Sequence, residues 1–227
     1  SHKFIYNDID SLHKLIKNLN GEVSCVVMDV VARQYPKPGF LEDVRELTEK
    51  NNILLIFDEV ITGFRMHSGG AQAFFNVTPD LACFGKAIAN GMPLSALVGK
   101  EEYMGRSDEI FYSLTFAGET LSLAAASAVL DIYNDLVIAK DLSDKGNLLI
   151  DGLNDIFQKN DLNNIFELQG MPCRPIVAFK NKNANGVNFN QTIINQFTLF
   201  MIEEMAKNGI LYNGSIFIST AHTQKDI

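Results

Sequence analysis

The sequence predicts an α/β domain with a mostly parallel sheet, followed by a smaller α+β domain. The first domain is indicated by short apolar runs that alternate with helical patterns over residues 1–135 of the 227-residue chain. The second is indicated by residues 136–227, where two long helical stretches accompany a few short apolar runs. In the first domain, two apolar runs are followed by a charged residue, Asp58 or Lys86, which points to a functional edge of the sheet.

The helices of the first domain are predicted from apolar periodicity and stop signals. Leucine and isoleucine at helical spacing predict a helix over residues 11–20, which ends at Gly21. The Pro-Lys-Pro-Gly turn at residues 36–39 admits a second helix over residues 40–50. An alanine-rich stretch predicts a third helix over residues 118–134, able to pack closely against the sheet or a partner.

Apolar runs predict the strands of the first domain over residues 23–31, 53–57, 81–84 and 94–98. The second domain is expected to contain helices over residues 138–159 and 191–208, and strands over residues 175–180, 210–212 and 216–219. Residues 181–190 include five asparagines, which predict an exposed loop.

Composition argues against several classes of function. The net charge of −8 leaves no basic face for nucleic acid. No apolar run approaches the roughly 18 residues that a membrane span needs, and the polar start of the chain is unlike a signal peptide. The four histidines and three cysteines show no metal-ligand spacing. Cys25, Cys83 and Cys173 are far apart and two of them lie in predicted strands, so we expect reduced, buried thiols in a cytoplasmic protein.

Asp58 and Lys86 are the candidate functional pair. In an open α/β sheet, ligands bind beyond the carboxyl ends of the strands, and these two residues follow two such strands, 28 residues apart. A carboxylate and an amine suit pyridoxal phosphate, which needs a partner for its ring nitrogen and an amine for its aldehyde. We therefore predict Lys86 as the Schiff-base lysine and Asp58 as the partner of the ring nitrogen. Because such a lysine must be neutral part of the time, we also expect a desolvated pocket around it.

The residues around this pair carry a family resemblance. Residues 54–65 read LLIFDEVITGFR, and residues 79–96 read PDLACFGKAIANGMPLSA. Together with PKPGFLEDVREL at 36–47 and LTFAGETLSLAAASA at 114–128, they closely resemble the class III (fold type I) pyridoxal-phosphate aminotransferases. The nearest subgroup is that of glutamate-1-semialdehyde aminomutase and its aminotransferase relatives. The resemblance runs from residue 4 to residue 227.

The resemblance implies that residues 1–135 are part of a large, cofactor-binding domain and that residues 136–227 are a small C-terminal domain, truncated at its end. Family members are much longer. They begin with an arm and half a domain that carry a glycine/serine phosphate loop and an aromatic residue stacked on the ring. Neither is found here, so we expect a fragment that lacks part of its cofactor site. The family pattern also implies a homodimer with shared active sites.

The resemblance also implies roles for single residues. Val60 would lie on the ring face, Thr115 would bind the cofactor phosphate of the other subunit, and Lys86 would move a proton between the substrate carbon and C4′ of the cofactor. On the substrate side we consider Glu59, which could instead form a salt bridge, and Arg174, the only arginine of the second domain, whose fork suits a carboxylate. A structural interpretation also remains open for these residues. Asp58 and Lys86 could each cap the end of a strand, and Val60 could be an ordinary core valine. Thr115 could be the N-cap of a helix, and Arg174 could be a surface arginine.

Three departures from the family pattern bear on the reaction. The chain has Asp29-Val30 where many members have Glu-Pro, and Ile61 where many have glutamine. It also has no acidic residue in LYNGSIFIST, where the aminomutases carry one shortly before their ISxAH segment. The last departure favours an aminotransferase, which moves an amino group between a small-molecule amino donor and an oxo acid or aldehyde acceptor. The alternative is glutamate-1-semialdehyde 2,1-aminomutase.

Two further classes of protein compete with this interpretation. ILLIFDE resembles the Walker B strand of a P-loop NTPase, but the required GxxxxGK[ST] is absent because Ala87 follows Lys86. A non-catalytic relative could keep the fold as an interaction module. The presence of both Asp58 and Lys86 argues against that, since a scaffold needs no amine facing a carboxylate.

Overall fold

The computed structural model describes residues 1–133, 137–180 and 189–227. The chain divides into two compact units, Ser1–Ala139 and Lys140–Ile227. The domain boundary expected between residues 135 and 136 lies outside the described residues, as do residues 181–188 of the predicted loop.

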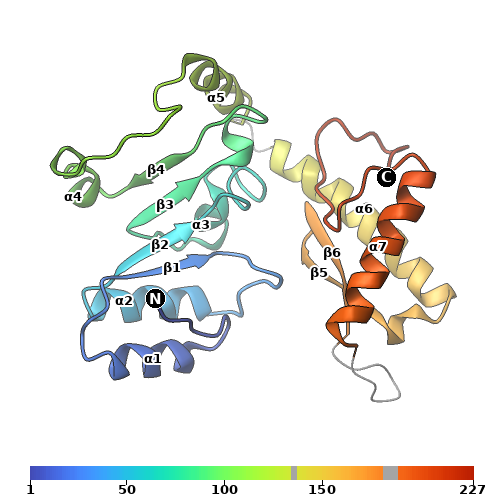
Figure 1. The fold of residues 1–227 in the computed structure, drawn as a ribbon, viewed down its shortest axis with the longest axis horizontal. Helices are drawn as coiled ribbons and strands as arrows, with labels where there is room; N and C mark the ends of the chain where they lie inside the picture. Colours follow the sequence, from blue (N-terminus) through green and yellow to red (C-terminus); the bar gives the residue numbers. More distant parts are fainter. Residues whose placement is uncertain (134–136, 181–188) are drawn as a thin grey trace. The chain divides into compact units, whose positions relative to one another are not determined.

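Among the described residues, the first unit contains a four-stranded sheet in the order β1-β2-β3-β4 (Figure 1). The strands are β1 (Cys25–Asp29), β2 (Leu54–Asp58), β3 (Leu81–Phe84) and β4 (Ala96–Gly99). β1, β2 and β3 are parallel, so the prediction of a mostly parallel sheet is confirmed, whereas β4 pairs with β3 in the antiparallel direction. Residues 85–95 join β3 to β4 without a crossover helix, and a connection this short favours antiparallel pairing.

The helices and 3-10 turns of the first unit are α1 (Ile9–Asn18), α2 (Phe40–Lys50), α3 (Gly70–Phe75), η1 (Lys86–Ile88), α4 (Glu101–Met104), η2 (Ser107–Glu109) and α5 (Thr120–Tyr133). α2 has the predicted bounds. α1 begins two residues earlier than predicted because the Asp8 side chain accepts a hydrogen bond from Ser11 N–H and caps the helix. α3 was not predicted, since the glycine pair before it indicates a loop.

One face of the sheet packs against α1 and α2. Side chains alternate along β1, so Val26 and Met28 are buried while Cys25 and Val27 are exposed. The same alternation buries one face of β2 and β3, and these residues form a single core cluster with Leu12, Ile16, Phe40, Leu41 and Val44 of the two helices. Burial of each such side chain contributes about 1.5–3 kcal/mol to folding.

This alternation corrects the expectation of buried thiols. Cys25 is exposed because it lies on the face of β1 that points away from the core cluster, and Cys83 is half-buried on β3. Cys173, in the second unit, is buried as expected. A cysteine inside an apolar strand is therefore buried only if it lies on a covered face of that strand.

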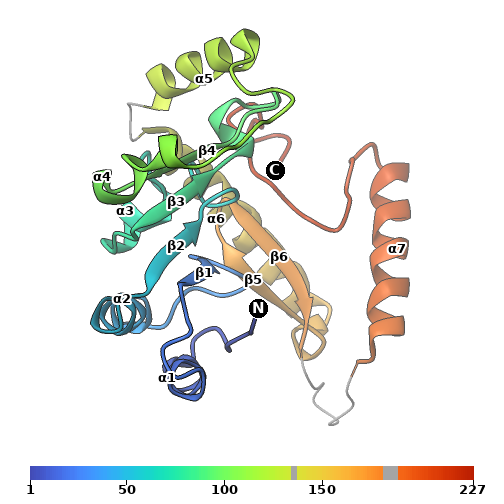
Figure 2. The ribbon, with the colours of Figure 1, turned by 60° about the vertical axis from the view of Figure 1, so that its left-hand side comes forward.

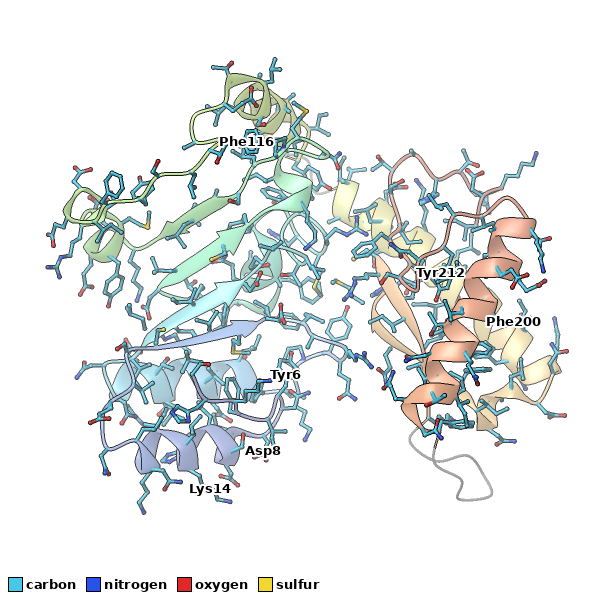
Figure 3. The ribbon with its side chains drawn as sticks, viewed as in Figure 1. Tyr6, Asp8, Lys14, Phe116, Phe200 and Tyr212 are labelled. Atoms are coloured by element: carbon cyan, nitrogen blue, oxygen red, sulfur yellow. The ribbon has the colours of Figure 1, made fainter. Side chains whose placement is uncertain are left out.

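Tyr6 fastens the N-terminal segment to the end of β1. Its hydroxyl donates to the carbonyl oxygen of Val30 at 2.7 Å, and its ring lies edge-on to that of Phe40 at 5.2 Å (Figure 3). Burial of the phenol, together with the negative charge of Asp29, raises the pKa of Tyr6.

The second unit contains two long helices and a hairpin (Figure 2). Its elements are most of α6 (Val137–Lys159), η3 (Leu162–Asn164), β5 (Phe166–Met171), β6 (Arg174–Phe179) and α7 (Gln191–Lys207). The ring of Phe166 joins these elements, because it lies 5.7 Å from Phe157 of α6, 4.9 Å from Phe179 of β6 and 4.8 Å from Phe197 of α7. The second unit therefore has the predicted α+β fold.

In the second unit, sequence reasoning missed one strand, β5, and wrongly predicted two others. β5 was not predicted because its sequence, FELQGM, mixes glutamate, glutamine and glycine into the strand. The strands predicted at residues 210–212 and 216–219 are irregular instead. Ile218 N–H donates to Cys173 O at 3.1 Å and Ser219 N–H to His222 Nδ1 at 2.9 Å, so the backbone is held by single bonds rather than by a ladder.

In the part of the chain that the structure describes, no single helix is long and apolar enough to cross a membrane. Only α5 and α6 taken together meet that condition, on length and composition alone.

Asp80 joins three segments at the beginning of β3. Its carboxylate accepts hydrogen bonds from Leu55 N–H at 2.8 Å and Lys100 Nζ at 2.7 Å, and forms an ion pair with Arg45 at 2.9 Å. The side chain is only 4% exposed. Burial acts to raise the pKa of Asp80, but the bonds from Leu55, Lys100 and Arg45 outweigh it and hold the pKa below its usual value.

We expect Asp80→Asn to lower the free energy of unfolding by about 2 kcal/mol at pH 7, because it leaves the two cations without their counter-charge. The folded-state pKa of Asp80 is lowered, so its charge stabilises the fold above the unfolded-state pKa and stops doing so as pH falls through the folded-state pKa. The difference between wild type and variant should therefore shrink in acid. Urea unfolding of both proteins over an acid pH series measures it, and a constant difference would contradict this explanation.

Candidate active site

The parallel pairing of β2 and β3 brings the two predicted key residues to one edge of the sheet (Figure 1). Asp58, the last residue of β2, lies opposite Cys83 of β3, and Lys86 begins η1 three residues further on. Glu59 N–H donates to Cys83 O at 2.9 Å and so continues the pairing beyond the strand. Asp58 and Lys86 therefore both lie at the carboxyl ends of neighbouring strands, where ligands bind in open α/β sheets.

The Asp58 carboxylate is held by the turn that follows it. Its Oδ1 accepts a hydrogen bond from Val60 N–H at 2.9 Å, and the residue is half-buried. The thiol of Cys83 lies close by: burial raises the pKa of Cys83, and the charge of Asp58 adds to that rise.

Val60 packs against the residue that precedes Lys86. A Cβ atom at Gly85 would lie 3.3 Å from Cγ1 of Val60, closer than most real contacts of such an atom, and 3.5 Å from Cγ2, an ordinary contact. Glycine at position 85 therefore lets Val60 approach the backbone just before the lysine. Asp58, Val60 and Lys86, three residues predicted to contact the cofactor, are gathered by this contact and by the strand pairing.

The backbone of Lys86 is strained. Its φ of +48° lies in the left-handed region, which costs a residue with a side chain about 1–2 kcal/mol. Hydrogen bonds hold the conformation, from Ile88 N–H to Gly85 O at 3.2 Å and from Asn90 N–H to Lys86 O at 3.0 Å. Strain of this kind concentrates at functional sites.

The described residues do not form the expected desolvated pocket around Lys86. The Lys86 side chain is exposed, although Ile88 and Ala89 after it are buried. Among the described residues, none covers the Lys86 side chain at this edge of the sheet. Across residues 1–133, 137–180 and 189–227, no group of three or more His, Cys, Asp or Glu could hold a metal ion.

Glu59 is used inside the chain, which corrects its candidacy for the substrate or a salt bridge. Its carboxylate is fully buried and accepts hydrogen bonds from the Thr62 hydroxyl at 2.6 Å, Ala71 N–H at 2.7 Å and Gln72 N–H at 2.8 Å. The donors are neutral and belong to the following turn and to α3. Sequence reasoning missed this role because the Gly69-Gly70 pair indicates a loop, whereas the structure begins the short helix α3 there.

Thr115 lies on an exposed turn before α5. The structural alternative for it, a helix N-cap, is taken by Glu119, whose carboxylate accepts from Leu121 N–H and Ser122 N–H at 2.7 Å each. The role of Thr115 at a cofactor phosphate stays a prediction.

Arg174 is the first residue of β6 and belongs to the second unit. Its guanidinium carbon lies 5.2 Å from the centre of the Phe217 ring, a cation–π contact that orients the side chain. Its role as a ligand for a substrate carboxylate stays a prediction.

A sequence model of class-III aminotransferases matches residues 5–214. The chain belongs to this family. It is 35% identical over 233 residues to a glutamate-1-semialdehyde 2,1-aminomutase of Methanosphaera stadtmanae, covering 98% of this chain and 54% of that protein. It is 37% identical over 190 residues to a 3-aminobutyryl-CoA aminotransferase of Cloacimonas acidaminovorans, covering 81% and 45%.

Two solved structures share the fold. The FumI protein of Sphingopyxis sp. MTA144, solved as its pyridoxal-phosphate internal aldimine, superposes with a TM-score of 0.86 at 24% identity, over 99% of this chain and 53% of that one. An omega-transaminase of Sphaerobacter thermophilus gives a TM-score of 0.84 at 26% identity, over 97% and 53%. The class-III chain spans about half the length of the curated relatives it matches.

The strain at Lys86 predicts an unusual order of stabilities. Lys86→Gly should be about 1 kcal/mol more stable than Lys86→Ala, because glycine adopts a positive φ at little cost. At Lys14, an exposed residue of helical backbone that projects from α1 (Figure 3), the order should reverse, since glycine in a helix is about 1 kcal/mol worse than alanine. Urea unfolding of the four variants without cofactor tests this. The same order at both positions would refute strain at Lys86.

Proposed function

We propose that the complete protein is a pyridoxal-phosphate-dependent aminotransferase, which moves an amino group between a small-molecule amino donor and an oxo acid or aldehyde acceptor. The observation that carries this proposal is the meeting of Asp58 and Lys86 at adjacent strand ends, in a chain of the class-III family. The three free cysteines fit the reducing conditions of the cytoplasm, where we expect the enzyme to act.

The residues present fit the cofactor. When bound, pyridoxal phosphate supplies an electron sink for the substrate carbon that loses its proton. Lys86 would offer its Nζ amine to the cofactor aldehyde and would then serve as the base that moves that proton. The Asp58 carboxylate, which accepts a hydrogen bond from Val60 N–H, would hold the proton on the ring nitrogen. Val60, packed on Gly85, would offer the ring an apolar surface.

A glutamate-1-semialdehyde 2,1-aminomutase is the second candidate. It is favoured by the names of several relatives at 32–35% identity that cover 98% of this chain. Against it stands the segment before Ser219, which has no carboxylate between residues 210 and 219. Formation of a free oxo acid from a separate amino donor would favour the aminotransferase, and its absence with conversion of glutamate-1-semialdehyde would favour the aminomutase.

An exposed apolar surface supports a homodimer with shared active sites. Thr115 lies among large exposed side chains, of which Phe111 is 95% exposed. The others are Ile110, Tyr112, Leu114, Phe116 and Leu121, and Figure 3 labels Phe116 near α5. Large exposed apolar side chains that follow one another so closely in the sequence favour an interface with another protein. We infer that a second copy of the protein covers it and that Thr115 then contacts the cofactor phosphate in the partner's site.

The function is tested by trapping the cofactor on the complete polypeptide. After addition of pyridoxal phosphate and reduction with borohydride, peptide mapping should find the pyridoxyl group on Lys86. Lys86→Ala should lose this adduct and lower turnover by at least about 10³-fold, because the same amine binds the aldehyde and moves the proton. Lys14→Ala, which changes an exposed lysine of α1, should retain both. Full activity in Lys86→Ala would rule out the assignment.

Shared sites are tested by complementation. Lys86→Ala and Thr115→Val are each expected to bind cofactor weakly as homodimers. When the two chains are co-expressed, about half of the dimers are mixed, and each mixed dimer regains one site with both residues intact, so about a quarter of all sites should recover. Cofactor content and activity of the mixture measure this. If Thr115 served its own subunit, no mixed dimer would hold an intact site and nothing would recover.

A further inference from the structure

Glu59 is a fully buried carboxylate that lies, in the sequence, between Asp58 and Val60, two residues proposed to hold the cofactor. All of its polar atoms are bonded within the first unit. Glu59 N–H donates to Cys83 O at 2.9 Å, and Glu59 O accepts from Gly63 N–H at 2.8 Å. The carboxylate accepts from Thr62, Ala71 and Gln72 at 2.6–2.8 Å. One residue thus joins the end of β3, the turn after β2 and the start of α3.

Two glycines lie in close contact with Glu59 and its neighbours. A Cβ atom at Gly70 would lie 2.6 Å from Oε1 and 2.8 Å from Oε2 of Glu59, and Gly70 has a φ of +79°. Only glycine combines that backbone with so close an approach. Gly63 is equally tight, since a Cβ atom there would lie 2.5 Å from the Phe84 ring and 2.7 Å from Glu59 O.

We propose that Glu59 is a positioning residue, whose buried carboxylate clamps the turn after β2 to α3 and thereby holds Asp58 and Val60 where the cofactor binds. This inference rests on the proposed function. Val60 N–H orients the Asp58 carboxylate, and the Val60 side chain contacts the backbone before Lys86. Any shift of the backbone at residue 59 therefore moves both the partner of the ring nitrogen and the apolar surface for the ring.

The chemistry of the clamp requires a carboxylate. Oε2 accepts from the Thr62 hydroxyl and Ala71 N–H, and Oε1 accepts from Gln72 N–H, so every neighbour of the two oxygens is a donor. Glutamine would keep the shape but place an N–H₂ group against one of those donors. Alanine would leave all three buried donors without an acceptor, which costs more than the loss of a single bond. Damage should therefore increase from Thr62→Val through Glu59→Gln to Glu59→Ala.

Asp80 provides a matched control for a purely structural effect. It is also a buried carboxylate of the same unit with three donors, but it lies at the beginning of β3, whereas the candidate site lies at the carboxyl ends of the strands. Asp80→Asn should lower stability without moving Asp58, Val60 or Lys86. A loss of cofactor affinity beyond that of Asp80→Asn would therefore report on position rather than on general destabilisation.

The experiment measures two quantities on the complete, cofactor-free polypeptide, the unfolding midpoint in urea and the dissociation constant of added pyridoxal phosphate. Binding is measured at a temperature at which every variant is folded. Relative to wild type, we expect dissociation constants about 3-fold higher for Thr62→Val, about 10-fold for Glu59→Gln and about 30-fold or more for Glu59→Ala. Asp80→Asn should stay within about 2-fold, despite its lower midpoint.

The graded series keeps the inference open to refutation even if Glu59→Ala does not fold. Dissociation constants for Thr62→Val and Glu59→Gln no higher than that of Asp80→Asn would overturn it and leave Glu59 a residue of stability alone. A wild-type protein that binds no pyridoxal phosphate would instead refute the proposed function, and with it the positioning role. The wild-type titration therefore distinguishes the two failures.

Discussion

The parallel pairing of β2 with β3 is the constraint on which the candidate site depends. It sets Asp58 opposite Cys83 and is continued by the hydrogen bond from Glu59 N–H to Cys83 O. If β3 ran the other way, the residues after it would lie at the opposite edge of the sheet, some four residues of strand away from Asp58. The strained turn at Lys86 and the contact of Val60 with Gly85 are useful only because this pairing has already brought the two strand ends together.

Two buried carboxylates stabilise opposite edges of this sheet by different means. Asp80, at the beginning of β3, is neutralised by Arg45 and Lys100, so it joins helix and loop to the sheet through charge. Glu59, beyond the end of β2, accepts only from neutral donors in the turn and α3.

Local signals were sufficient for most elements of the first unit. α2 has the predicted bounds, because a turn before it and a polar stop after it are both encoded nearby. β3 also has the predicted bounds, since a short apolar run between polar residues admits few alternatives. β5 escaped prediction because its polar residues become strand only by pairing with β6. The exposure of Cys25 escaped it too, because a strand sequence does not say which of its faces is covered.

The sequence by itself determined the family, the strand ends and the residue types at the site, because the motifs around Asp58 and Lys86 are contiguous in the chain. The tertiary structure decided how those residues are held. The roles of Gly85 and Gly70 depend on atoms that approach them from distant positions, Val60 and Glu59. The burial of Glu59 likewise follows from a helix that begins eleven residues later. Such contacts arise from packing between segments, which no local pattern of residues specifies.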